Sequence, residues 1–275
     1  MKKQNPFIVV AAVTAAVIAA TWLLLAAPGL TGNQINMTRG VTPQSVTHYD
    51  LHMTILWICI VIGVIVFSAM FVSIVLHRKS RGHEAAGFTH STKMEIIWTV
   101  IPVLILVVTA VPATRALVNM EVAPETEMTV KITGFQWRWK YEYVEDDLSF
   151  ISSLDPESNA ARRLASGENP ADVDNYLLEV DKPLVLPADT RIKFLITADD
   201  VIHSWWVPAL GWKRDAIPGF INEAWTEIEE PGVYRGQCAE LCGKDHGFMP
   251  IVLHVLPRDE YVAWVIEQQD RLAAN

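Results

Sequence analysis

Several signatures that would define a simple function are missing from this chain. Its 275 residues contain only three cysteines and no Cys-x-x-Cys-His motif, so it carries no site for covalent haem attachment. The long apolar segments hold no histidine array that could ligate haem, and no Met-rich or His-rich stretch offers the capture segment of a copper chaperone. No internal repeat occurs. The chain is therefore not a self-contained haem protein, and any electrons that it handles come from a separate carrier.

Four soft metal ligands, in contrast, gather within twelve residues, at Cys238, Cys242, His246 and Met249. Thiolate and thioether sulfur stabilise reduced copper, and imidazole also binds the oxidised ion. A mononuclear blue copper site uses one cysteine, two histidines and a weak methionine, which leaves the second cysteine over. Two cysteines can instead bridge two copper ions, each capped by a histidine, and His203 supplies the upstream histidine that this arrangement needs. The cluster favours a redox copper site.

Two other interpretations of the cluster stay open on the residues alone. A structural zinc site usually takes four Cys and His ligands, with short spacers between paired cysteines and no use for methionine. A disulfide between Cys238 and Cys242 would form only in an oxidising compartment and leaves His246 and Met249 unexplained. The third cysteine, Cys59, lies alone in an apolar run and is predicted to be a packing residue.

Three long apolar runs, in a chain that is 51% hydrophobic, indicate a membrane protein. Phe7–Ala27 follows Lys2 and Lys3, so residues 1–28 are predicted to be a signal peptide or an N-terminal anchor. Met53–Leu76 and Ile96–Val118 are each long enough to cross a bilayer. Residues 48–118 are therefore predicted to form a transmembrane helical hairpin.

Charge sets the orientation of this hairpin. Basic residues between the second and third runs, among them Arg78, Lys79 and Arg81, place that loop in the cytoplasm and export everything after residue 118. From Asn119 onward the chain has 28 acidic against 14 basic residues, whereas residues 1–118 have 3 against 8. An exported part this acidic repels nucleic acid and attracts a cationic protein, unless the acids serve only solubility.

The exported part is predicted to be an all-β domain, residues 119–257, with the short strands of a Greek-key sandwich or barrel. The strand candidates alternate or are rich in β-branched and aromatic residues, and they are Thr129–Tyr143, Tyr176–Val180, Arg191–Thr197, Val233–Gln237 and Ile251–Leu256. The polar stretch Glu145–Asn175 is predicted to be a surface excursion with one helical turn. Residues 258–275 are predicted to be a terminal helix and tail.

The chain resembles subunit II of cytochrome c oxidase, the electron-accepting subunit of the haem-copper terminal oxidases, over most of residues 48–256. Four motifs carry the resemblance, and they are Glu95-Ile-Ile-Trp-Thr-Val-Ile-Pro102, Gly134-Phe-Gln-Trp-Arg-Trp-Lys-Tyr-Glu-Tyr143, Asp199-Asp-Val-Ile-His-Ser-Trp205 and the stretch Cys238–Met249. The resemblance implies a cupredoxin-like domain on the periplasmic side of a bacterial inner membrane. It also implies that electrons pass from cytochrome c to a catalytic subunit, subunit I, which reduces dioxygen with proton translocation.

The same resemblance implies the site residues. A binuclear copper A centre would have two bridging thiolates, one histidine on each copper and two weak axial ligands, which are Cys238, Cys242, His203, His246, Met249 and the backbone carbonyl of Glu240. The Glu240 carboxylate would bind magnesium or manganese at the interface with subunit I, although a loop glutamate is by default simply solvated.

Electron and proton paths are implied as well. Electrons would enter at Trp137, although period-two spacing groups Trp137 with core aromatics, so this role needs an irregular strand end. Cytochrome c would dock on four acids, Glu142, Asp181, Asp199 and Asp200. Glu95 would lie at the mouth of a proton-uptake path, where an acid is otherwise an ordinary hydrated charge. Two alternatives stay open: a copper A protein of another reductase, such as nitrous oxide reductase, and a periplasmic copper chaperone. Quinol-oxidase subunits lack the two cysteines.

Overall fold

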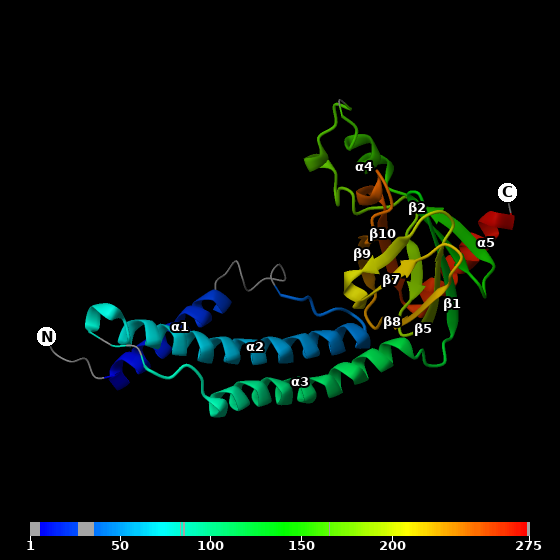
Figure 1. Ribbon diagram of the computed structural model, residues 1–275. Coiled ribbons are helices and arrows are strands. Elements are labelled where there is room, and N and C mark those ends of the chain that lie inside the picture. Colours follow the sequence, from blue (N-terminus) through cyan, green and yellow to red (C-terminus); the bar gives the residue numbers. More distant parts are fainter. Residues whose placement is uncertain (1–5, 27–35, 83, 85, 165, 274–275) are drawn as a thin grey trace. The chain divides into compact units, whose positions relative to one another are not determined.

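The computed structural model describes residues 6–26, 36–82, 84, 86–164 and 166–273 (Figure 1). The chain forms two compact units. One holds the residues up to 38 together with 49–114, and the other holds 39–48 and everything from 115 onward. The first unit is helical, and the second contains all the strands of the described residues.

Three long helices precede the strands: α1 (Pro6–Ala26), α2 (Pro43–Leu76) and α3 (Thr92–Glu121), with a short turn η1 (Lys79–Arg81) before α3. Within the described residues, α2 and α3 are long and apolar enough to cross a membrane. Large side chains such as Phe67 and Ile74 are more than half exposed, as lipid or another subunit would require. The two predicted transmembrane helices are confirmed. Cys59 is exposed on α2, on a helix that lipid or another subunit would cover, so its packing role stays a prediction.

The N-terminal prediction is only partly covered by the structure. Helix α1 contains a shorter apolar stretch, Ile8–Ala20. The flanking Lys2, Lys3 and Pro28 lie outside the described residues. The choice between a signal peptide and an anchor for residues 1–28 therefore stays a prediction.

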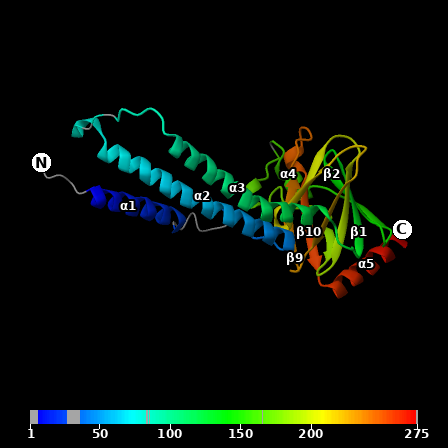
Figure 2. The same ribbon diagram turned by 60° about the horizontal axis from the view of Figure 1, so that its bottom comes forward.

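Two five-stranded sheets form the second unit (Figure 2). The first has the order β3 (Leu148–Ser152), β2 (Arg138–Tyr143), β1 (Met128–Phe135), β5 (Arg191–Ala198) and β8 (Asn222–Glu227). The second has the order β4 (Leu184–Pro187), β10 (Pro250–Leu256), β9 (Gly232–Cys238), β6 (His203–Val207) and β7 (Trp212–Ala216). The β1–β5 and β4–β10 pairs are parallel and the other pairs are antiparallel. This crossed order is that of a β-sandwich.

The core lies between the sheets because apolar residues alternate along the strands, as in β5, where every second residue is buried. Aromatic rings fill it: Trp205 stacks on Trp212 at 5.3 Å between centroids and on Phe194 at 5.6 Å. The terminal helix α5 (Arg258–Ala273) buries Tyr261 and Val265 against this core, so the predicted helix after Pro257 is confirmed.

Two strand predictions are wrong. Thr129–Tyr143 is not one strand but the antiparallel pair β1 and β2, joined by a turn at Gln136 and Trp137. Tyr176–Val180 is not a strand, because Leu177 has a positive φ of 62° and Val180 makes only an isolated bridge. The predicted strands at 191–197, 233–237 and 251–256 are confirmed as β5, β9 and β10.

The predicted excursion after Glu145 contains β3 and one short helix, α4 (Pro156–Ala161), with a 3-10 turn, η2 (Pro170–Asp172). Asp155 caps α4, because its carboxylate accepts the Ser158 N–H at 3.0 Å, and Pro156 fits the first turn. The predicted helical turn is therefore present.

Candidate metal centre

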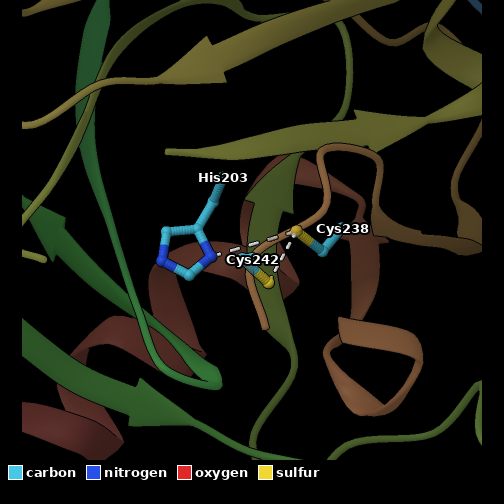
Figure 3. A group of neighbouring side chains, drawn as sticks. All are labelled: His203, Cys238 and Cys242. Atoms are coloured by element: carbon cyan, nitrogen blue, oxygen red, sulfur yellow. Dashed lines mark hydrogen bonds between the residues drawn. The ribbon is translucent and has the colours of Figure 1, made fainter. Parts of the chain in front are cut away.

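Sheet pairing brings three metal ligands together at one end of the second sheet. His203 begins β6 and Cys238 ends the antiparallel β9, with Trp205 opposite Cys238, so both lie at the same end. Cys242 follows in the next loop. One ligand atom from each of His203, Cys238 and Cys242 lies within 4.8 Å of the others (Figure 3). His203 therefore lies beside the two cysteines because of the strand register, although it is distant from them in the sequence.

The distances around this cluster are those of converging ligands rather than of a disulfide. Sγ of Cys238 is 3.8 Å from Sγ of Cys242 and 4.0 Å from Nδ1 of His203 (Figure 3). On the other side, Sγ of Cys242 is 3.5 Å from Nδ1 of His246. Both cysteines are free, so the structure contains no Cys238–Cys242 disulfide.

The remaining predicted ligands surround the same place. Met249 is buried and its carbonyl accepts the Cys238 N–H at 3.0 Å. The Glu240 carbonyl lies 3.4 Å from Sγ of Cys238, while the residue as a whole is exposed. His203 is fully buried and His246 is half-buried. A mixture of buried thiols, imidazoles and a thioether suits copper better than zinc.

Trp137 lies in the β1–β2 turn and not in the row of buried aromatic side chains along β2. Trp139, Tyr141 and Tyr143 are fully buried, but Trp137 is half-buried, and its Nε1 donates to the Cys242 carbonyl at 3.1 Å. Gln136 Nε2 donates to the same oxygen at 2.9 Å. The turn is the irregular strand end that the predicted role of Trp137 needs.

Gly243 makes this close approach feasible. Its φ is +118°, and a Cβ there would lie 3.0 Å from Gln136 Nε2 and 3.2 Å from the Trp137 ring. Any side chain there would strain the backbone of the ligand loop, residues 239–249, and would crowd Gln136 and the Trp137 ring. Lys244 places its ammonium 5.6 Å from the centre of the same indole ring.

Asp200 has a contact that the sequence reasoning missed. Its Oδ1 accepts from His203 Nε2 at 2.9 Å, and its Oδ2 accepts the Gln136 N–H at 2.7 Å. An ionised carboxylate only accepts hydrogen bonds, so this contact leaves the lone pair of His203 on Nδ1, which faces Cys238. The signal was available, since an acid three residues before a ligand histidine can orient its ring.

The electrostatics of the cluster favour thiolate formation at one cysteine first. Burial opposes the shift, but the contact with His203 and hydrogen bonds from backbone N–H groups lower the pKa of Cys238. Burial and the neighbouring Cys238 raise the pKa of Cys242. Burial alone would lower the pKa of His203, yet its contacts with Cys238 and Asp200 raise it. Hydrogen bonds from His203, Gln136 and Val201 outweigh burial and lower the pKa of Asp200.

The other predicted acids lie outside the ligand cluster. Glu142 pairs with Lys131 at 3.1 Å and with Lys140 at 3.0 Å, and despite partial burial these lysines lower its pKa. Asp181 accepts the Ser153 N–H at 2.7 Å. Asp199 is exposed beside Asp200.

Glu95 belongs to the other unit. It lies in the first turn of α3 and is half-buried there. Its role on a proton path and the docking role of the acids stay predictions.

Comparisons with known proteins give two family matches. Residues 128–256 match "Cytochrome C oxidase subunit II, periplasmic domain", and residues 31–115 match "Cytochrome C oxidase subunit II, transmembrane domain". The crystal structure of the periplasmic domain of subunit II of cytochrome oxidase (CoxB) of Bradyrhizobium japonicum is 37% identical. The match covers 55% of this chain and 99% of the chain in that crystal structure, with a TM-score of 0.48.

Curated relatives agree with these matches. A "Probable cytochrome c oxidase subunit 2" of Rickettsia felis is 47% identical over 69% of this chain, which spans only 57% of that protein. The Rickettsia prowazekii relative is 42% identical over 84% of this chain and 71% of that protein. The "Cytochrome c oxidase subunit 2" of Cyanidium caldarium is 37% identical over 84% of this chain and 89% of that protein.

The two apolar helices and the match to a periplasmic domain describe a multi-pass protein of the inner membrane. The buried His and Cys cluster lies inside the matched periplasmic domain. On both family matches and on these relatives, the chain belongs to the cytochrome c oxidase subunit II family.

Proposed function

We propose that this chain is the electron-accepting subunit of a cytochrome c oxidase. It takes electrons from reduced cytochrome c at a binuclear copper A centre and passes them to a haem-copper subunit I, which reduces dioxygen to water and translocates protons. The convergence of His203, Cys238, Cys242 and His246 in a family-matched domain is the observation that carries the proposal. We divide the chain into residues 1–28 (signal or anchor), 48–118 (hairpin), 119–257 (copper domain) and 258–275 (terminal helix).

The protein positions the ligands and excludes water. Two copper ions, when bound, supply a one-electron couple that is shared between them. Cys238, Cys242, His203 and His246 would hold these ions, together with the Met249 sulfur and the Glu240 carbonyl as weaker ligands. Burial of His203, Cys238, Cys242 and Met249 keeps this ligand set rigid, which limits rearrangement during each transfer.

Electrons enter at Trp137, whose indole is one hydrogen bond from the Cys242 backbone. A basic cytochrome c docks on the acidic domain through Glu142, Asp181, Asp199 and Asp200, where opposite charges accelerate association. The exposed Glu240 carboxylate binds magnesium or manganese together with subunit I. Glu95 lies at the mouth of a proton path into subunit I.

Purification of the membrane complex through this chain tests the proposal. A haem-bearing subunit should co-purify, and anaerobic reduced cytochrome c should reduce the copper chromophore before the haems, at a rate that falls with added salt. Purification of a haem-free chain would favour a copper chaperone instead. Reduction by quinol but not by cytochrome c would contradict the choice of donor.

A further inference from the structure

Hydrogen bonds join the two ends of the excursion, defined here as residues 153–181, and an ion pair connects it to the β domain. The Ser153 N–H donates to Asp181 Oδ1 at 2.7 Å, and the Asp181 N–H donates to the Ser153 carbonyl at 3.0 Å. One step inward, the Asp155 N–H donates to the Glu179 carbonyl at 3.1 Å. Glu179 also pairs with Arg235 of β9 at 2.6 Å. The base of the excursion is thus fixed relative to the strand that ends at Cys238.

Helix α4 then fixes one arginine inside this excursion. Ser158 and Ala161 of α4 are buried, and the Leu177 N–H donates to Ser158 Oγ at 3.3 Å, so the helix packs against the returning arm of the excursion. Arg162 follows directly, and its Nε donates to Asn159 Oδ1 at 2.8 Å, one helical turn back. That contact holds the guanidinium in one orientation and leaves its other nitrogens for a partner.

The partner is the ligand loop, which Figures 1 and 2 show as an orange segment beside α4. Arg162 Nη1 is 3.1 Å from Asp245 Oδ1, and its guanidinium carbon lies 4.4 Å from the centre of the Phe248 ring. Both ionic groups are about three-quarters buried, with side-chain exposures of 24% and 23%. Asp245 and Phe248 flank His246, and the Phe248 N–H donates to the Asp245 carbonyl at 2.9 Å. The Arg162 side chain therefore contacts both ends of the turn, residues 245–248, that contains this ligand.

We propose that Arg162 is a positioning residue for the metal centre, and that the excursion serves as a strap that holds the His246 turn in its ligating conformation. The inference rests on the proposed copper function. An isolated surface ion pair would have little effect on the site. Here a charge-assisted hydrogen bond to Asp245, directly before the ligand His246, and a cation–π contact with Phe248, two residues after it, act together.

Copper release from the full chain in detergent tests the strap. Wild-type chain and the variants Arg162→Ala, Arg162→Lys and Arg163→Ala are loaded with copper and mixed with excess chelator. Arg162→Ala should release copper roughly 10- to 100-fold faster and change the copper hyperfine pattern, as expected for loss of a group that orients a ligand. Arg162→Lys should lie between, because an ammonium keeps the charge but not the planar contact with Phe248. Arg163 is exposed at the same helix end, so Arg163→Ala should match the wild type.

Two further variants cover the case in which Arg162→Ala does not fold. Asp245→Asn removes the ion pair and Phe248→Leu removes the cation–π contact, each from the side of the loop. Each should accelerate release and change the same spectrum. Release and spectra equal to those of the wild type in the folded variants would overturn the strap. A wild-type chain that binds no copper would instead refute the proposed function.

Discussion

At the scale of single residues, the Asp200 carboxylate connects the two sides of the metal centre. One oxygen holds the ring of His203, and the other holds the backbone of Gln136 beside Trp137. A carboxylate in contact with a ligand imidazole fixes its tautomer and strengthens it as a donor. Asp200 therefore does more than add surface charge, although the family resemblance implied only a docking role for it.

Asp200→Asn should lower copper affinity roughly 10- to 100-fold, because the neutral amide no longer holds the His203 ring as an ionised acceptor does. Equilibrium copper titration of the full chain measures this. Asp199→Asn is the matched control, since it removes the same charge from an exposed neighbour and should leave copper affinity unchanged. Equal losses in both variants would show that charge alone, not the contact with His203, matters.

The lowered pKa of His254 determines part of the pH dependence of the free energy of unfolding. Burial lowers the pKa of this β10 histidine, Arg235 lowers it further, and Glu179 opposes both. The folded chain therefore holds fewer protons than the unfolded chain just below the ordinary histidine pKa of about 6.5. The stability that His254 contributes is present above about pH 6.5 and is lost as the pH falls toward its folded pKa.

His254→Gln should flatten the loss of stability between about pH 7 and pH 5, because glutamine does not titrate in this range. Chemical denaturation of the apo chain at several pH values measures the free energy of unfolding. Parallel curves for the wild type and the variant would contradict the assignment.

At the scale of elements, the β1–β2 hairpin is where sequence pattern and fold differ most. Both arms alternate, and Ile132 pairs with Tyr141 while Gly134 pairs with Trp139, so the buried rows of the two arms lie opposite each other. Trp137 in the turn leaves this row and is only half-buried. The turn residues, Gln136 and Trp137, carry no Gly, Pro, Asn or Asp signal. Strands such as β5 could be predicted because their alternation is regular. The short strands β3, β4, β6, β7 and β8 could not, since strands of four to six residues hold little pattern.

Gly134→Ala tests how tightly this hairpin packs on the site. A Cβ at Gly134 would lie 3.0 Å from both His203 Cδ2 and the Trp139 ring, so both rings must shift. We expect a loss of about 1 to 3 kcal/mol in the free energy of unfolding, together with weaker copper binding. Gly247→Ala serves as control, because a Cβ there meets nothing within 4 Å. Unchanged stability of Gly134→Ala in denaturant melts would contradict the close packing.

At the scale of the whole molecule, the two membrane helices and the four clustered candidate ligands could be predicted from local features. Apolar runs of membrane length and four ligands within twelve residues are visible in the sequence. The contact of Arg162 with the ligand loop could not be predicted, because it joins residues 83 apart through an excursion that has no periodic pattern. The pairing of β6 with β9, which brings His203 to the cysteines, is likewise a product of strand order rather than of local sequence.

Metal analysis combined with electron paramagnetic resonance of the copper-loaded full chain decides whether the site is binuclear. We expect two coppers per chain that share one unpaired electron, and loss of this shared-electron spectrum in Cys242→Ser, because one bridging thiolate is removed. A single copper with a mononuclear spectrum, bound zinc, or a Cys242→Ser variant that keeps the shared-electron signal would contradict it.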